Sequence, residues 1–349
     1  MPRRTATAPE GSHHALRRLA NHVSKSPGEF HLIERLLKRL GPGRRAILGP
    51  GDDCAILPRP RACQLLTIDS MVEDVHFNLA WGTPQALGRR ALTVNLSDIA
   101  AMGGKPTVCV VNLAVREGLG VRFFDRMYQG LGKAAARAEV EVVGGNVTRA
   151  GALAITVALL GEVRGTALRR DAARPGDTIY VTGTLGDAAA GLRILSGRLR
   201  ARATARKFLI NRFLQPTARL EAGLGLARIK PAPAAIDLSD GLWQDLGHLL
   251  ERSGAGAEIE AGALPLSTAY RAVIGDDPAL ALGGGEDYEL LFCLRHALPA
   301  SALARSLGVR VSRIGRVTSS GKAVLLGARG AAGAPALTGW DQLRSRLRG

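Results

Sequence analysis

Residues 94–103, VNLSDIAAMG, form the second half of a helix predicted to begin at Thr83-Pro84 and to end at Gly103-Gly104. Proline suits the first turn of a helix, and glycine suits the residue just after its end. Asn95 and Asp98 lie three residues apart in this helix, whose other positions are apolar nearly all round. A carboxylate there has little water, and burying it is costly unless a cation or hydrogen bonds meet it.

On both sides of this helix, short apolar segments alternate with segments of helical periodicity, as in a sheet with helices packed on it. A first helix is predicted with Ser26 as its N-cap, Pro27 at its first position and Glu29 as the reciprocal cap, so the ordered fold is expected to begin near here. We predict strands at 46–48, 54–57, 65–68 and 107–115, a helix at 121–138, a strand that ends at Val143, and a strand at 152–160.

After Val163 the pattern restarts, which indicates a second α/β domain. We predict a strand at 178–182, a Gly-rich turn, helices up to about residue 228, a strand at 234–238, a helix at 242–252, strands near 257–259 and 288–293, a helix near 300–307, and short closing strands. The predicted fold class is therefore α/β (α+β), with two domains of mixed sheets flanked by helices. The predicted boundaries are a disordered basic tail at 1–27, an N-terminal domain at 28–164 and a C-terminal domain at 165–349.

The composition is that of a folded, soluble protein: 46% of the 349 residues are hydrophobic and 22% are charged. The apolar stretches are about strand length, so no membrane span is expected, and the basic tail lacks the apolar core of a secretory signal. A cytoplasmic location follows as an expectation. The net charge of +17 invites a nucleic-acid role, but the basic residues are scattered and have few aromatics among them, so no nucleic-acid partner is predicted. The four widely spaced cysteines are predicted to be buried apolar thiols.

Five acidic or near-acidic motifs each follow or end an apolar segment, where we interpret them as turns at the edge of a sheet. They are Gly51-Asp52-Asp53, Thr67-Ile68-Asp69, Asn95-Leu96-Ser97-Asp98, Gly144-Gly145-Asn146 and Asp237-Leu238-Ser239-Asp240-Gly241. Any one of them is better explained as an ordinary turn or helix cap. As a set they suit Mg²⁺ that carries substrate phosphates, because Mg²⁺ prefers a few hard oxygen ligands.

Two Gly-rich segments supply a complementary feature. Gly144-Gly145 and the segment from Gly183 to Gly186 would let backbone N–H groups approach a phosphate, and the second precedes a helix whose N-terminus favours an anion. Neither segment is a Walker loop or a dinucleotide-binding fingerprint, so the common nucleotide-binding folds lose support.

Six motifs, in order and at characteristic spacing from about Gly28 to Trp340, resemble the thiamine-monophosphate kinase family. They are GEF (28–30), GDDCA (51–55), VNLSDIAAMG (94–103), YVTGT (180–184), DLSDGL (237–242) and GGEDYEL (284–290). The resemblance implies the two-domain fold of the aminoimidazole-ribonucleotide synthetase-like superfamily and a homodimer formed through the N-terminal sheets. It also implies Mg²⁺-dependent transfer of the γ-phosphoryl group of ATP directly to the phosphate of thiamine monophosphate, without a nucleophilic residue or a strong general base.

The resemblance also implies a role for particular residues. The magnesium ligands would be Asp53, Asp69, Asp98 and Asp237, with Asp240 on a further ion, oxygens from Thr67 and Ile68, and Asn146 at the place of a further ligand. Of these, Asp53, Asp98 and Asp237 are the predicted catalytic residues. The predicted ATP contacts are Gly145, Asn146, Arg170 and Ser239, and the predicted thiamine pocket holds His76, Glu286 and Trp340.

The chain departs from the family pattern at two places. Gly144-Gly145-Asn146 stands where Gly-Gly-Asp is usual, which replaces a carboxylate by a neutral amide, and Thr67-Ile68-Asp69 replaces Ser-Thr-Asp, which loses a hydroxyl. Asn146 leaves open a non-catalytic protein that binds thiamine phosphates or nucleotide. Two other superfamily members, selenophosphate synthetase and the hydrogenase-maturation dehydratase, are disfavoured because the first would need a reactive Cys or selenocysteine with a nearby Lys and the second a C-terminal Cys. Without the resemblance, His76, Arg170 and Trp340 would pass for a surface histidine, a solvated charge and a core aromatic.

Overall fold

The N-terminal half of the chain forms a four-stranded sheet with helices on one face. The computed structural model describes residues 29–40, 45–47, 55, 57–327 and 332–333. The strand order is β1 (Cys63–Val72), β4 (Ala154–Val163), β2 (Lys105–Val115) and β3 (Glu141–Arg149). The pairs β1–β4 and β4–β2 are antiparallel, and β2–β3 is parallel.

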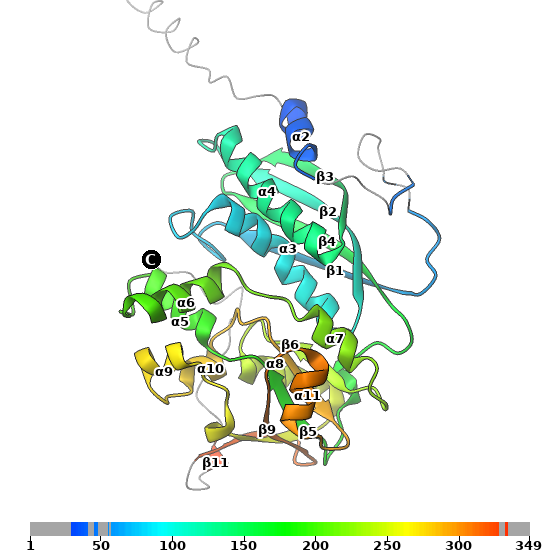
Figure 1. Cartoon of the computed structure of the whole chain (residues 1–349), viewed down its shortest axis with the longest axis vertical. Helices are drawn as coiled ribbons and strands as arrows, with labels where there is room; N and C mark the ends of the chain where they lie inside the picture. The colour runs from blue at the N-terminus through cyan, green and yellow to red at the C-terminus, as the bar shows by residue number, and fades with distance from the viewer. Residues whose placement is uncertain (1–28, 41–44, 48–54, 56, 328–331, 334–349) are drawn as a thin grey trace, which may run out of the picture.

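Two long helices, α3 (Pro84–Ala101) and α4 (Val121–Ala138), pack together against this sheet, and α2 (Glu29–Leu37) packs on α4 (Figure 1). The Thr83 side chain caps α3 by accepting a hydrogen bond from the backbone N of Ala86 at 3.2 Å. Close approach of α3 and α4 requires glycine, because a Cβ on Gly88 would lie 1.9 Å from the carbonyl oxygen of Met127. The buried side chains of these helices and of the inner sheet face form one apolar core.

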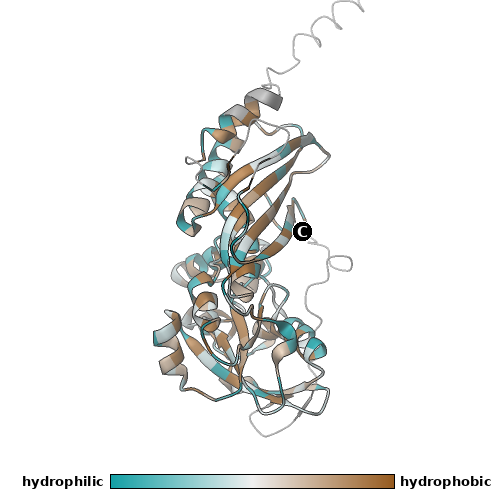
Figure 2. Ribbon diagram, turned by 90° about the vertical axis from the view of Figure 1, so that its right-hand side faces the viewer, coloured by the Kyte–Doolittle hydropathy of each residue, from teal (hydrophilic) through white to brown (hydrophobic). Residues whose placement is uncertain are grey.

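The other face of this sheet carries exposed apolar side chains. Leu66 and Ile68 on β1 are 74% and 65% exposed, and Val110 on β2 is also exposed. Figure 2 shows the helices on one side of the N-terminal strands and apolar residues along the strands themselves. Large apolar side chains on one open sheet face are typical of an interaction surface.

The C-terminal half forms a seven-stranded sheet in the order β11-β10-β7-β9-β5-β8-β6. In chain order these strands are β5 (Thr178–Thr182), β6 (Ala234–Asp237), β7 (Gly256–Glu260), β8 (Leu290–Leu294), β9 (Val311–Thr318), β10 (Ala323–Leu326) and β11 (Ala332–Gly333). The helices are α5 (Asp187–Leu195), α6 (Ala203–Leu214), α7 (Leu220–Leu226), α8 (Leu242–Ser253), α9 (Thr268–Ile274), α10 (Ala279–Gly283) and α11 (Ala300–Leu307), with 3₁₀ turns η1 (Arg170–Ala172) and η2 (Ala261–Ala263).

Helix α3 joins the two halves. Its C-terminal part contacts α7 and β6, and Ala100 and Ala101 belong to an apolar cluster otherwise built from C-terminal residues. A Cβ on Gly223 of α7 would lie 2.1 Å from the carbonyl oxygen of Ala100, so the helix backbones touch. The helix that carries Asp98 is therefore fixed against both sheets.

Most of the predicted elements are confirmed, with α3, α4, β5 and α11 within two residues of their expected bounds. Four segments differ from the prediction. Residues 67–69 and 144–146 lie inside β1 and β3 rather than in turns, and the described residues of 46–48 and 54–57 are not in strands. Cys109 and Cys293 are buried as predicted, but Cys63 is exposed at the start of an edge strand. The short helices α9 and α10 were not anticipated. Among the described helices, none is long and apolar enough to cross a membrane.

Candidate active site

Three carboxylates from different elements converge where the two halves meet. Asp69 extends from β1, Asp98 from α3 and Asp237 from the end of β6. Asp237 is buried, Asp98 is half-buried and Asp69 has one side open to solvent. Sequence reasoning named all three, and the structure brings them together.

Loss of hydration and mutual repulsion raise the pKa values of these three carboxylates. Burial and then the charge of Asp98 raise the pKa of Asp237 to about 7. Desolvation, the charge of Asp98 and a hydrogen bond to Asp98 raise the pKa of Asp69 to about 6. Burial also raises the pKa of Asp98, against the opposing effects of the Thr67 hydroxyl and Arg170. The negative charge of these three carboxylates is thus greater than the neighbouring groups of the protein compensate.

Hydrogen bonds from neighbouring polar side chains orient the three carboxylates. Thr67 Oγ1 donates to Asp98 Oδ2, as the position of Thr67 on the inner side of β1 allows. The backbone N of Asp69 donates to Asn95 Oδ1 at 3.1 Å, and Ser97 Oγ donates to Asp237 Oδ2 at 2.7 Å. Asn95 and Ser97 are fully buried on α3. The side chain of Ile68 lies on the opposite, exposed face of β1.

The segment after β6 adds a fourth carboxylate and a counter-charge. Asp240 is half-buried, and burial raises its pKa. The positive charge of Arg170, at the start of η1, opposes the rise that burial causes in the pKa of Asp98, Asp237 and Asp240. Ser239, between the two aspartates, accepts a hydrogen bond at its carbonyl oxygen from Glu286 N at 2.7 Å.

The donor set of this cluster suits Mg²⁺. Carboxylates with raised pKa values and a hydroxyl form a hard-oxygen site that a divalent cation would relieve of excess charge. Among the described residues, no group of three or more Asp, Glu, His or Cys side chains is arranged so that it could hold a metal ion by itself. Mg²⁺ needs none, since it is usually held by one or two carboxylates, waters and substrate phosphates.

Gly145 and Asn146 lie elsewhere on the N-terminal sheet. Asn146 pairs in register with Asn112, and Asn112 with Thr156, on the outer face; Asp69 pairs with Val157, on the inner face. Three strand spacings, roughly 14 Å, separate β3 from β1. Asn146 Nδ2 donates to Asn112 Oδ1 at 3.0 Å. A Cβ on Gly145 would lie 2.2 Å from the carbonyl oxygen of Val111, so strand packing alone demands glycine there.

The predicted anion site at the N-terminus of α5 is filled by a carboxylate of the chain. Asp287 accepts hydrogen bonds from Gly186 N at 2.6 Å and from Ala188 N at 3.2 Å. Both the Gly-rich turn and Asp287 are buried. Gly183 N and Leu185 N donate to the carbonyl oxygens of Arg310 and Pro265, so these amides of the turn have a structural role in the C-terminal half.

His76 and Glu286, 210 residues apart, are brought together by Arg90 of α3. Arg90 Nη2 lies 2.6 Å from Glu286 Oε2, and Arg90 Nη1 donates to the carbonyl oxygen of His76 at 3.2 Å. His76 Nδ1 accepts a hydrogen bond from Val72 N at 3.1 Å. Two predicted substrate residues thus lie at one place, close to the acidic cluster, since the charge of Glu286 contributes to the raised pKa of Asp69.

Known proteins resemble this chain along most of its length. Residues 51–163 match the AIR synthase related protein, N-terminal domain, and residues 174–327 match the C-terminal domain of the same family. The chain is 43% identical to the thiamine-monophosphate kinase of Escherichia coli strain K12 over 305 residues, which cover 84% of this chain and 91% of that protein. The chain belongs to the thiamine-monophosphate kinase family.

Two solved thiamine-monophosphate kinase structures share its fold. The crystal structure of the enzyme from Stenotrophomonas maltophilia K279a is 38% identical and superimposes with a TM-score of 0.77, covering 88% of this chain and 98% of that one. AaThiL complexed with AMPPCP and TMP is 36% identical, with a TM-score of 0.71 and coverage of 90% and 96%. The predicted AIR synthase-like fold and family are confirmed.

The structure of this thiamine-monophosphate kinase family member describes most, but not all, of the predicted site residues. Asp53 and Trp340 lie outside the described residues, as does the tail at 1–27. Conversely, the sequence indicates no role for Arg90, and it places Asn95 and Ser97 in an acidic motif without indicating that they hold β1 and Asp237. Arg90 and Asn95 stand in a helix of otherwise apolar character, and a polar residue there was the available signal.

Proposed function

We propose that this chain transfers the γ-phosphoryl group of ATP to thiamine monophosphate, giving thiamine diphosphate, with Mg²⁺ as cofactor and as a homodimer. The observation that carries the proposal is the convergence of Asp69, Asp98 and Asp237 beside Arg170 at the boundary of the two halves. The Escherichia coli relative is named for this kinase activity, and AaThiL binds both an ATP analogue and TMP.

The chemistry asks for positioning and charge compensation. Mg²⁺, when bound, neutralises phosphate charge and aligns phosphate oxygens. Asp69 and Asp98 would hold the cation, assisted by Asp237 and, on a further ion, by Asp240. Thr67, Asn95 and Ser97 keep these carboxylates and the β1 backbone in place. Arg170 would bind phosphate oxygens, and no general base is needed because the acceptor phosphate is already anionic.

The outer face of the N-terminal sheet supports the homodimer and the remaining ATP contacts. Leu66, Ile68 and Val110 form its apolar part, and a polar row that includes Asn112 and Asn146 crosses the strands beside them. An isologous dimer would bury the apolar part. Because the side chain of Asn146 lies on this face, away from the carboxylates of its own chain, Asn146 and the neighbouring backbone of Gly145 would contact ATP at the dimer-facing side. Residues 28–164 would thus form the dimer interface and the main ATP- and Mg²⁺-binding domain, and Asp237, Asp240 and Arg170 would complete the site from the C-terminal half.

Thiamine monophosphate would bind beside His76 and Glu286. Both lie at the boundary between the halves, within electrostatic reach of the acidic cluster. A carboxylate at this place suits the cationic thiazolium ring, and Trp340 is the predicted aromatic of the pocket. The acceptor phosphate could then point toward Asp69 and the bound nucleotide.

The test is an assay with ATP, Mg²⁺ and thiamine monophosphate that measures ADP and thiamine diphosphate together. We expect equimolar ADP and thiamine diphosphate, and no turnover with EDTA. The rival function, a binding protein without catalysis, is favoured only by Asn146. It would give tight binding of thiamine monophosphate in calorimetry with no thiamine diphosphate at any Mg²⁺ concentration, and that result would refute the proposal.

A further inference from the structure

Arg90 contacts both His76 and Glu286, the two predicted acceptor residues that the structure describes. A single guanidinium binds the carboxylate of Glu286 at 2.6 Å and the backbone carbonyl of His76 at 3.2 Å. Glu286 is 196 residues away in sequence, on the other half of the molecule. Charge-assisted contacts of this kind are stronger and more directional than neutral hydrogen bonds.

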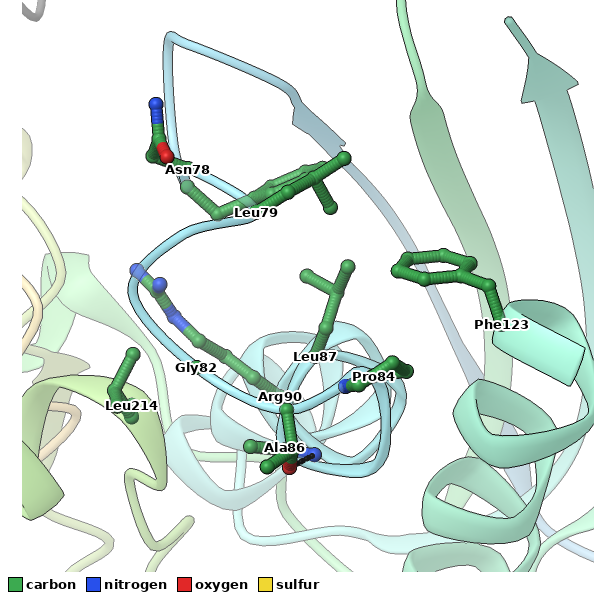
Figure 3. A pocket seen from close by; sticks show the side chains of 11 residues that line it. Asn78, Leu79, Gly82, Pro84, Ala86, Leu87, Arg90, Phe123 and Leu214 are labelled. Carbon is green, nitrogen blue, oxygen red and sulfur yellow. Dashed lines mark hydrogen bonds between the residues drawn. The ribbon is translucent and has the colours of Figure 1, made fainter. Parts of the chain in front are cut away.

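The surroundings of Arg90 leave it little freedom. The residue is only 2% exposed, and its guanidinium lies over the ring of Phe213, 4.2 Å from the centroid. Figure 3 shows the side chain leaving α3 and running beside the loop that carries Asn78 and Leu79, opposite Leu214. A buried cation is retained at high cost unless a partner compensates it, and Glu286 is the partner.

The cavity that Arg90 lines together with other described residues is too small for a substrate. It has a volume of about 30 Å³, and its walls are mostly apolar, including Phe77, Leu87 and Leu214. That is room for about one water molecule. Among the described residues, Nε of Arg90 has no hydrogen-bond partner, in keeping with this small apolar recess. Any effect of Arg90 on the acceptor therefore passes through Glu286 and His76.

The backbone around Glu286 is already fixed, which leaves its side chain to be oriented. Glu286 has a φ of 76°, and its N–H donates to the carbonyl oxygen of Ser239 at 2.7 Å. A non-glycine residue in this left-handed conformation persists where surrounding structure over-determines it. The glutamate side chain is 24% exposed, and Arg90 holds it at Oε2.

We infer that Arg90 is a positioning residue for the acceptor: it fixes the Glu286 carboxylate and the His76 backbone in the arrangement that binds thiamine monophosphate. This inference rests on the proposed function. It locates acceptor recognition at a contact between the halves, so that α3 supplies Asp98 to the phosphate side and Arg90 to the acceptor side. Arg90 therefore affects the KM for thiamine monophosphate more than the KM for ATP.

The test compares Arg90→Met and Arg90→Lys with a matched control, Arg89→Met. Arg89 is the neighbouring residue on α3 and also reaches the C-terminal half, where its Nη1 donates to Gln215 Oε1 at 2.8 Å, but it touches neither Glu286 nor His76. For Arg90→Met we expect the KM for thiamine monophosphate to rise about tenfold or more and the KM for ATP to stay within about twofold. Arg90→Lys keeps the charge but cannot hold both partners, and it should recover part of the loss.

A double-mutant cycle identifies the route of the effect. If Arg90 acts through Glu286, Arg90→Met should add less than about twofold to the KM of Glu286→Gln. An unchanged KM for thiamine monophosphate in Arg90→Met, equal changes in both KM values, or the same effect from Arg89→Met would overturn the inference. If Arg90→Met does not fold, Arg90→Lys with a wild-type KM would overturn it instead.

Wild-type turnover and binding, measured first, keep the two proposals apart. A wild-type enzyme that neither binds nor phosphorylates thiamine monophosphate refutes the proposed function, and the inference with it. If the wild type is fully active and the Arg90 variants keep its KM for thiamine monophosphate, only the inference is refuted.

Discussion

Asp98→Asn distinguishes a cation-binding carboxylate from a structural one, because the two roles predict opposite changes in stability. Asparagine keeps the shape of the side chain, and its oxygen can still accept the hydrogen bond from Thr67 Oγ1. The change removes one negative charge beside Asp69 and Asp237, whose pKa values Asp98 helps to raise. In the absence of Mg²⁺, that charge works against the folded state.

We therefore expect the free energy of unfolding of the metal-free variant to rise on the order of 1 kcal/mol, by relief of like-charge repulsion. The kcat should fall on the order of 100-fold or more, because a group that organises charge around the transferring phosphoryl is lost. If Asp98 were a structural acid, its replacement would instead lower stability and leave turnover nearly intact.

The measurements are denaturant unfolding in EDTA and steady-state kinetics at saturating Mg²⁺. Asp125→Asn is the matched control, since Asp125 is a buried carboxylate on α4 that pairs with Arg35 and Arg39 and lies outside the acidic cluster. It should lose stability and keep its kcat. Near-wild-type turnover in Asp98→Asn at saturating Mg²⁺ would refute the metal-binding role.

Three further changes test other parts of the molecule. Asn146→Asp should lower the Mg²⁺ concentration needed for half-maximal rate by restoring a carboxylate, and an unchanged requirement would remove this position from the metal site. Leu66→Asp with Ile68→Asp should convert a dimer into a monomer in sedimentation, since both side chains are exposed on the open sheet face; a monomeric, fully active wild type would contradict that. Glu289→Gln should lower the free energy of unfolding, measured with urea, by about 3–5 kcal/mol. The reason is that Arg219, whose Nε lies 2.6 Å from Glu289 Oε2, would lose its charged partner. Although burial raises the pKa of Glu289, the hydrogen bond and charge of Arg219 lower it overall, so this stability is present above the unfolded pKa of about 4.3 and is lost as the pH falls below it.

The sequence was sufficient where local signals and tertiary packing agree. Helix α4 has the predicted bounds, because its apolar period and its flanking glycine act within one segment. The segment at 144–146 was mistaken for a turn because Gly144-Gly145 resembles one locally. The reason for glycine lies instead on the neighbouring strand, where the Val111 carbonyl would meet a Cβ. Such a contact between segments distant in sequence leaves no periodic signal.

The same limit applies to the site. Asp69, Asp98 and Asp237 could be named in advance because the family motifs carry them, but the groups that orient them could not. The role of Ser97 depends on Asp237, 140 residues away, and the role of Arg90 depends on Glu286. Asp287 shows the converse. The Gly-rich turn at the N-terminus of α5 suits a phosphate, but the N–H of Gly186 already donates to the carboxylate of Asp287, which comes from a distant loop. The sequence shows the types of the residues in the site, but it does not show which of them contact each other in space.

These pairings also explain why the site stands at the boundary of the two halves. Asp98 on α3 and Asp237 on β6 repel each other across it, and the repulsion raises the pKa of Asp237. The contacts between Ser97 and Asp237, and between Arg90 and Glu286, oppose that repulsion across the same boundary. Because α3 supplies one member of each interaction, a cation that neutralises Asp98 would strengthen the contact between the halves and hold Arg90, and with it Glu286, in place.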